Sequence, residues 1–226
     1  MRTEEVILRD YGFALTNYNG IEVYSNNKLT DHFYREAGQK SKIVIHHTAG
    51  GFEGDLMTLV SSKVSVAFLI SPKGKIVMLH HPKYWAWHLG RGALGGNETQ
   101  SRLGIGIELS NWGFLVRKGD ILFNYLGRPY CRMADAQLYQ ESIPWKRFGN
   151  VNVKYFSRYT EEQYVSLKKI KDKLCQLYGI PDVKFSKGYS TEVINFKGIT
   201  THTDFRLDKY DLSPIFDWTK IISQAI

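Results

Sequence analysis

Two distant apolar segments constrain the fold most, because each of them ends in a histidine. Residues 43–47 read IVIHH and residues 198–202 read GITTH. Runs that are rich in β-branched residues and followed by glycine or a polar cluster predict buried strands. Ligands and catalytic groups collect at the strand ends of α/β sheets. If these two strands lie side by side, they bring His46 and His202 together.

A carboxylate follows the second segment. Asp211 lies in the predicted loop after residue 202, and two imidazoles with one carboxylate form the ligand set of a catalytic zinc that keeps a fourth position for water. A buried histidine at the end of a strand is more often a satisfied core residue than a metal ligand, so that alternative stays open for either histidine alone. The three residues together indicate a metal site.

The rest of the chain predicts an α/β scaffold of one domain. Its 226 residues can bury a full core, and no repeat or low-complexity linker divides them. The pattern predicts further elements in chain order: strand 42–46, helix 54–62, a hairpin 66–71 and 75–80, strand 105–110, helix 160–179 behind the capping box T-E-E-Q, strand 198–202 and a last helix after Pro214. Residues 1–40 form an N-terminal extension, in which 21–24 could add an edge strand.

Four motifs in this order resemble the type 2 N-acetylmuramoyl-L-alanine amidases. They are HHTAG at 46–50, IGIEL at 105–109, H-x-D at 202–204 and K-x-D-x-x-P-x-F-D-W at 209–218. This group includes phage endolysins, cytosolic anhydro-muropeptide amidases and peptidoglycan-recognition proteins. The resemblance covers residues 42 to 218 with similar spacing.

The resemblance implies a fold and a function. The fold would be a single α/β domain over 41–226 with a central mixed β-sheet flanked by helices. The implied activity is zinc-dependent hydrolysis of the amide between N-acetylmuramic acid and L-alanine in bacterial peptidoglycan, as in a phage-type lysin. Its metal ligands would be His46, His202 and Asp211. The alternatives are a peptidoglycan-binding module without catalysis and a cytosolic amidase of muropeptide recycling.

Two residues are candidates for catalysis. Glu108 places a charge on an otherwise apolar strand, where an unpaired carboxylate is costly unless it has a partner or a function. We therefore expect Glu108 to act as the acid and base, with a structural salt bridge as the alternative. Lys209 matches the family lysine that faces the scissile carbonyl, where it could stabilise an oxyanion.

One departure from the family supports Glu108. Several relatives carry a tyrosine or histidine on the strand before the turn P-K-G, whereas this chain has VAF at 66–68. The resemblance also implies that Trp87 and His88 border the substrate, and that Asn111, after the strand that carries Glu108, does so too.

Two further residues are expected to support the site from outside the ligand set. His47 follows the ligand and must point to the opposite face of its strand, because side chains alternate. Asp204 could hold the backbone near His202 or orient the site.

Residues 111–159 are expected to form an inserted loop region. Their periodicity is irregular, and K-G-D at 118–120 suggests a small hairpin inside them. Trp145, Tyr155 and Phe156 could line a saccharide groove, or they could simply pack the insertion onto the domain.

The net charge of +8 is compatible with an anionic partner. Wall polymers are favoured over nucleic acid, since the sequence has no zinc-finger spacing and no basic helix. No leader and no apolar run long enough to cross a membrane is present, so we expect a protein made in the cytoplasm that acts on the wall after release. Cys131 and Cys175 are expected to be free thiols. The sequence predicts nothing about oligomeric state.

Overall fold

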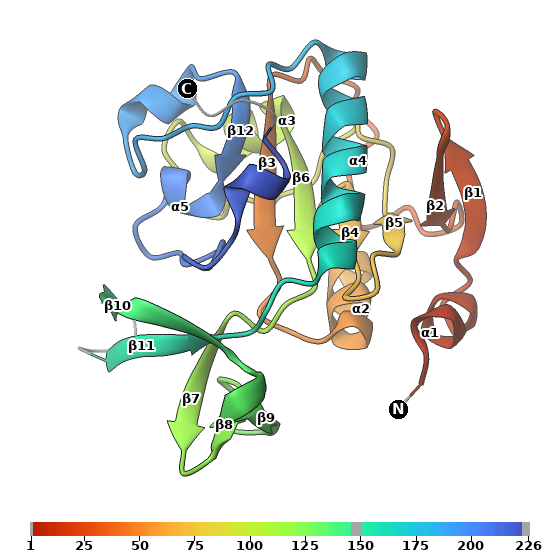
Figure 1. Ribbon diagram of the computed structural model, residues 1–226. Helices are drawn as coiled ribbons and strands as arrows, with labels where there is room; N and C mark the ends of the chain where they lie inside the picture. The colour runs from red at the N-terminus through yellow and green to blue at the C-terminus, as the bar shows by residue number, and fades with distance from the viewer. Residues whose placement is uncertain (1, 146–150, 223–226) are drawn as a thin grey trace.

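A seven-stranded mixed sheet forms the centre of the computed structural model, which describes residues 2–145 and 151–222 (Figure 1). The strand order is β1-β2-β5-β4-β6-β3-β12. These strands are β1 (Ala14–Tyr18), β2 (Ile21–Ser25), β3 (Lys42–His47), β4 (Phe68–Ile70), β5 (Ile76–Met78), β6 (Gly104–Leu109) and β12 (Gly198–Thr201). The four strands β4, β6, β3 and β12 run parallel, whereas β5 is antiparallel to β4. The predicted mixed sheet is confirmed.

Helices cover the sheet on both sides because its central strands are apolar on both faces. They are α1 (Glu4–Asp10), α2 (Phe52–Ser61), α3 (Asn97–Leu103), α4 (Glu161–Tyr178) and α5 (His202–Phe205), with short 3-10 turns η1 (Met133–Asp135), η2 (Thr191–Ile194) and η3 (Trp218–Lys220). Ile43 and Ile45 pack on one side in the same core as Leu167 of α4. Val44 points to the other side and packs against Phe205 of α5.

Helix α4 begins and ends where the sequence predicts. The side chain of Thr160 accepts from the backbone N–H of Gln163, and the Gln163 side chain accepts from the backbone N–H of Thr160, which completes the capping box. Gly179 ends the helix with a φ of 63°, in the left-handed region that glycine adopts without strain.

The N-terminal segment belongs to the main body of the protein. Strands β1 and β2 form a hairpin, and β2 pairs in parallel with β5, so the predicted strand at 21–24 exists but β1 is the edge. Val23 lies in the core on the α4 side of the sheet. Helix α1 packs Leu8 against Leu56 of α2. The first 40 residues therefore pair and pack with the main sheet and its helices rather than standing apart from them.

The insertion is a second sheet rather than a loop region, which corrects the prediction. Its five antiparallel strands have the order β10-β11-β7-β8-β9. They are β7 (Phe114–Lys118), β8 (Ile121–Phe123), β9 (Pro129–Arg132), β10 (Gln137–Trp145) and β11 (Val151–Phe156). The predicted hairpin at 118–120 is confirmed as the β7–β8 turn. Figure 1 shows this second sheet beside the carboxyl ends of β3 and β6.

The aromatic residues Tyr155 and Phe156 of the insertion differ in how deeply they are buried. Phe156 is fully buried and packs with Phe114 and Val153, so it belongs to the small core of the second sheet. Tyr155 is partly buried in β11. The side chain of Trp145 lies outside the described residues.

Three smaller predictions concern the end of the chain, the cysteines and the membrane. The helix expected after Pro214 is only the short turn η3 within the described residues. Cys131 and Cys175 are free thiols, and both are partly rather than fully buried. Across the part of the chain that the structure describes, no helix combines the length and apolar character needed to cross a membrane.

Candidate metal and catalytic site

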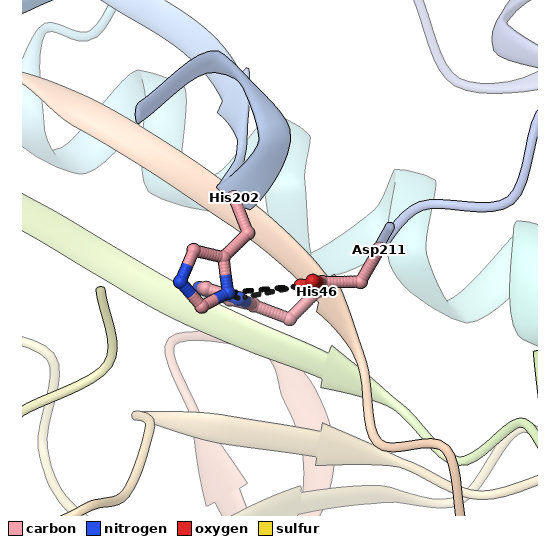
Figure 2. A group of neighbouring side chains, drawn as sticks. All are labelled: His46, His202 and Asp211. Atoms are coloured by element: carbon pink, nitrogen blue, oxygen red, sulfur yellow. Dashed lines mark hydrogen bonds and ion pairs between the residues drawn. The ribbon is translucent and has the colours of Figure 1, made fainter. Parts of the chain in front are cut away.

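His46, His202 and Asp211 come together at the carboxyl edge of the main sheet (Figure 2). His46 lies near the end of β3, and His202 is the first residue of α5, directly after the neighbouring parallel strand β12. Asp211 Oδ2 lies 3.0 Å from His46 Nδ1 and 3.2 Å from His202 Nδ1. The two Nδ1 atoms are 3.2 Å apart, and all three side chains are buried. The convergence predicted from the two strands is confirmed.

The outer nitrogens of both imidazoles are held by one short segment. His202 Nε2–H donates to the carbonyl oxygen of Leu89 at 2.8 Å. His46 Nε2 lies 3.1 Å from His88 Nδ1. Adjacent residues 88 and 89 therefore turn both rings so that their Nδ1 atoms face Asp211. Hydrogen bonds of this kind fix the tautomer and the ring orientation of metal-binding histidines.

The arrangement of lone pairs fits a cation. When His202 is neutral and donates from Nε2 to Leu89, its Nδ1 carries a lone pair that points at Asp211 Oδ2, which is also an acceptor. Two acceptors at this distance repel each other unless a positive charge lies between them. Two nitrogens and one oxygen are ligands that zinc accepts in catalytic sites. The donor set therefore fits a divalent metal ion.

The electrostatics of the set favour the same state. Burial lowers the pKa of His46 to about 4, so this imidazole is neutral at physiological pH. Burial alone would raise the pKa of Asp211, but the interactions of this carboxylate with the rings of His202 and His46 outweigh that effect and hold the pKa below its ordinary range. Metal ligands must be deprotonated in this way.

Glu108 of β6 lies next to the three candidate metal ligands. It is the register partner of His46 on the neighbouring parallel strand, so both side chains point to the same face of the sheet. Its Oε2 atom is buried and has no hydrogen-bond partner among the described residues. Burial, followed by the charges of Asp211 and Asp55, raises the pKa of Glu108 well above its ordinary value, while Lys209 opposes this shift. Among the described residues Glu108 forms no salt bridge.

A cavity of about 200 Å³ opens beside these groups. Both polar and apolar side chains line it. The residues that matter here are Glu108, His202, Lys209, Asp211, Trp87 and Val66. The cavity thus brings a carboxylate, an amine and two members of the His46, His202 and Asp211 set to one space that a small substrate group could enter. Val66, two residues before β4, lines the cavity from the segment where several relatives carry a tyrosine or histidine.

Trp87 and His88 both line the cavity but differ in their burial and hydrogen bonds. Trp87 is half-buried and its Nε1–H donates to the hydroxyl of Tyr34 at 3.0 Å. His88 is buried behind His46. Its ring packs on β6 at Gly104 and Gly106, where an added Cβ would approach it to 3.1 and 3.2 Å. His88 therefore supports His46 and also lines the cavity, so its contact with substrate stays a prediction.

Asn111 lies away from the cavity, although it was expected to bind substrate. Its Nδ2 donates to the carbonyl oxygens of Ser157 and Arg158, and its Oδ1 accepts from the backbone N–H of Gly113 at 2.7 Å. These bonds use both amide hydrogens and hold the segments that connect β7 and β11 to the main sheet. A role in substrate binding is therefore not supported by the hydrogen bonds of this residue.

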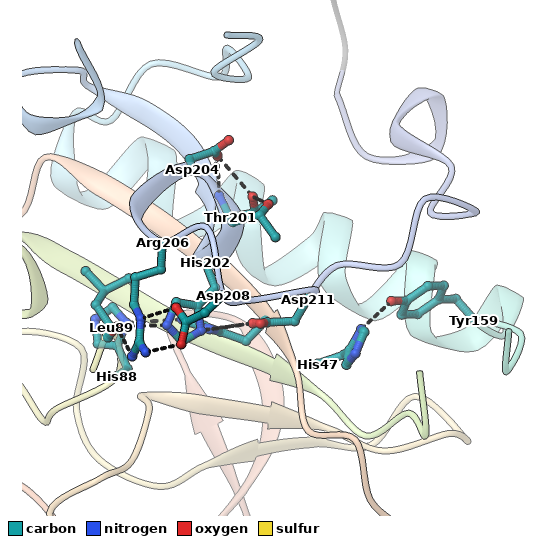
Figure 3. A network of polar contacts seen from close by, with 12 residues as sticks. His47, His88, Leu89, Tyr159, Thr201, His202, Asp204, Arg206, Asp208 and Asp211 are labelled. Carbon is teal, nitrogen blue, oxygen red and sulfur yellow. Dashed lines mark hydrogen bonds and ion pairs between the residues drawn. The ribbon is translucent and has the colours of Figure 1, made fainter. Parts of the chain in front are cut away.

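His47 and Asp204 support the site from outside (Figure 3). His47 points away from the ligand set, and its Nδ1 accepts from the hydroxyl of Tyr159 at 2.8 Å. That hydroxyl accepts from the backbone N–H of Ser213, two residues after Asp211. Asp204 Oδ2 accepts from the backbone N–H of Thr201 at 2.7 Å. Asp204 therefore fixes the turn that presents His202.

Sequence reasoning missed two contributors to this site. The first is the carbonyl of Leu89, which leaves no signal because every residue carries one. The second is Asp55 of α2, whose Oδ2 accepts from Thr48 Oγ1 at 2.8 Å and from Ser110 Oγ at 2.5 Å. These bonds tie the loop after β3 to the end of β6. Burial raises the pKa of Asp55 to about 6. Its helical position gave no hint of this connection.

The fold and the site define a class of protein. Residues 37–214 match the family model described as N-acetylmuramoyl-L-alanine amidase, and the chain belongs to this family. Over 84 residues it is 34% identical to the N-acetylmuramoyl-L-alanine amidase AmiD of Escherichia coli K12, a stretch that covers 34% of this chain and 30% of AmiD.

Solved structures show the same fold. AmiD from E. coli, in complex with the substrate anhydro-N-acetylmuramic acid-L-Ala-D-γ-Glu-L-Lys, has a TM-score of 0.53 at 20% identity. The match covers 92% of this chain and 64% of the AmiD chain. AmpDh3 from Pseudomonas aeruginosa, in complex with an anhydromuramic pentapeptide, has a TM-score of 0.51 at 18% identity over 87% of this chain and 64% of its own. The chain thus spans less than two thirds of either relative.

Proposed function

We propose that this protein hydrolyses the amide bond between N-acetylmuramic acid and L-alanine in bacterial peptidoglycan. The observation that carries the proposal is the cavity in which Glu108 and Lys209 lie beside the His46, His202 and Asp211 set. Membership of the amidase family supports it, and two relatives with this fold were solved with muramyl peptides. A module that only bound peptidoglycan would not need a complete donor set next to an unpaired carboxylate.

Zinc is the metal that we propose for the site. His46, His202 and Asp211 would hold it through Nδ1, Nδ1 and Oδ2, the three atoms that face one another. When bound, zinc in such a set lowers the pKa of water to roughly 7 and polarises a substrate carbonyl. Leu89 and His88 would keep both imidazoles in the orientation that this requires.

Glu108 is the proposed acid and base. Its buried and unpaired Oε2 can accept a proton from the attacking water and then deliver it to the amine that leaves as L-alanine. The pKa of Glu108 is raised in the metal-free site. A nearby cation lowers the pKa of a carboxylate, which would return Glu108 toward the ionised form that a base needs.

Lys209 is proposed to stabilise the charge that develops on the carbonyl oxygen. It lines the same cavity as Glu108, two residues before Asp211. Its ammonium is a donor that is in place before the reaction, which is the property of an effective oxyanion site. Trp87, which lines the same cavity, would border the substrate.

Digestion of purified peptidoglycan, followed by mass spectrometry of the soluble products, tests this function. We expect free stem peptides that begin at L-alanine, their loss after chelation, and their return when zinc is added. Products that retain the muramoyl–alanine bond would contradict the proposal. An undigested wall that still binds the protein would instead indicate a binding module.

A further inference from the structure

One face of the second sheet begins at the rim of the catalytic cavity. Phe114, Val116 and Lys118 alternate along β7, so their side chains share a face. At the inner end of this face the ring of Phe114 lies 5.9 Å from the ring of Tyr210, measured between centroids. Tyr210 lines the cavity. The face therefore leads outward from the site along β7.

Neighbouring strands extend this face sideways. Val116 is the register partner of Phe123, and Lys118 is the partner of Ile121. Ile121 is in turn paired with Arg132 of β9. Directly opposed residues on adjacent strands lie on the same side of a sheet. We call the surface formed by Val116, Lys118, Ile121, Phe123 and Arg132 the docking face.

The docking face exposes apolar groups that a folded chain normally covers. Val116 is 40% exposed and Ile121 is 42% exposed. Tyr125, which is 47% exposed, lies beside Phe114 with ring centroids 6.4 Å apart and continues the apolar surface. The ammonium of Lys118 lies 5.0 Å from the centre of the Phe123 ring. Apolar patches bordered by charged residues mark sites of interaction.

The charge of the insertion identifies the kind of partner. Residues 111–159 contain eight Lys and Arg against three Asp and Glu, a net charge of +5 out of +8 for the whole chain. Among the side chains that the structure describes, Lys118 and Arg132 are exposed and take no part in an ion pair. A partner with negative charges and apolar rings or chains complements such a surface.

We propose that the docking face binds polymeric peptidoglycan while one stem peptide of the same polymer occupies the cavity. The proposal rests on the proposed function and extends it to the form of the substrate. Sugar rings and aliphatic side chains of the polymer would cover Val116, Ile121 and Phe123. Carboxylates of neighbouring stem peptides would pair with Lys118 and Arg132. Because the face is continuous with the cavity rim, a polymer that places one stem peptide in the cavity can also cover the face, which favours the wall over nucleic acid.

A double charge reversal, Lys118→Glu with Arg132→Glu, tests the proposal. The matched control is Lys28→Glu with Lys169→Glu, which makes the same change in net charge at two exposed positions outside the insertion. Three quantities are measured for each protein: sedimentation with purified sacculi stripped of attached phosphate polymers, the turnover of these sacculi, and the turnover of a soluble monomeric muramoyl peptide.

We expect the docking-face variant to bind and cleave sacculi about tenfold less well, as the loss of several exposed charge contacts implies. Its turnover of the soluble peptide should be unchanged, and the control should match the unmodified protein on both substrates. An equal loss on both substrates, or unchanged binding to sacculi, would overturn the proposal. So would binding that appears only when the phosphate polymers are left in place. If the unmodified protein cleaved neither substrate, the proposed function would fail, and the sedimentation comparison would still decide whether the docking face binds the wall.

Discussion

Lys209 lies beside the proposed metal ligands and is the one amine for which we propose a role in the reaction. It lines the cavity with Glu108 and opposes the rise in the pKa of that carboxyl. A lysine ammonium has no lone pair to give to a metal ion, so Lys209 is not a candidate ligand. Its proposed work is therefore confined to the charge that develops during the reaction.

Replacing Lys209 should separate catalysis from binding. We expect Lys209→Ala to lower kcat roughly 100- to 1,000-fold, the typical effect of removing one oxyanion donor, with a much smaller change in KM. Steady-state kinetics on a soluble muramoyl peptide measure both constants. A variant that lost its activity through a raised KM alone would place Lys209 in ground-state binding instead.

The convergence of the proposed metal ligands was the most predictable part of the candidate site. His46 and His202 could be found because β-branched runs precede them, and strand order then forces them together. His88 and Asn111 were placed at the substrate by resemblance, yet their hydrogen bonds run to His46 and to the backbone of the second sheet. The residue type alone does not reveal which groups the polar atoms of a side chain will bond to in the fold.

At the scale of an element, the segment 87–89 organises the candidate metal site although it is neither helix nor strand. It is anchored by backbone hydrogen bonds, since Trp87 N–H donates to the carbonyl of Lys63 and Ser65 N–H donates to that of Trp87. These bonds hold His88 and Leu89 against the two ligand imidazoles. The segment therefore orients the two imidazoles, and we expect changes in it to alter metal affinity.

His88→Phe should weaken zinc binding about 10- to 100-fold, because it removes the acceptor of His46 Nε2–H and keeps a ring of similar size. His88→Asn should restore much of the affinity, since its Oδ1 can accept the same hydrogen bond. Competition with a chromogenic chelator measures zinc affinity without reference to turnover. Equal affinity in the protein and both variants would show that this hydrogen bond does not position His46.

The elements that prediction missed have weak patterns for identifiable reasons. Strands β8 and β9 are short, and residues 114–118 show two buried residues followed by three exposed ones rather than a regular alternation. Its small core needs Phe114 of β7 and Phe156 of β11 together, and these are distant in sequence. The hairpin β1–β2 has an almost wholly exposed first strand, so only the partner strand β5 gives it a place in the fold.

The whole molecule holds several histidines in buried, neutral form, and this makes its stability depend on pH. Burial lowers the pKa of His80 to about 3, with His32 and Lys40 as further contributors. In the unfolded chain a histidine titrates near 6.5. The unfolded state therefore binds more protons below this pH, so the contribution of His80 to stability is fully present above pH 6.5 and is lost as the pH falls toward 3.

Between pH 7 and pH 5 the free energy of unfolding of the chelator-treated protein should accordingly fall more than that of the chelator-treated variant His80→Gln. Over this range His80 should account for about 2 kcal/mol of the loss, at roughly 1.4 kcal/mol per pH unit below 6.5. Urea unfolding at both pH values gives the free energies of unfolding. Identical pH dependence in the two proteins would show that His80 is not held neutral.

The domain boundary at residue 40 and the place where the protein acts stay predictions. The match to the family model begins at residue 37, whereas β1 and β2 extend the main sheet toward the N-terminus. Action on the wall after release depends on the proposed function, which is a claim about the whole molecule. That claim joins a metal held by three residues to proton transfer by a fourth.

Zinc content and turnover, measured on the same samples of Glu108→Gln, test this claim most directly. We expect one zinc per chain, as in the unmodified protein, with turnover on muramoyl peptide reduced roughly 100- to 10,000-fold, the usual contribution of general acid–base catalysis. His202→Ala serves as the control and should lose both zinc and activity. A fully active Glu108→Gln protein with bound zinc would contradict the account, because the proton would then have another acceptor.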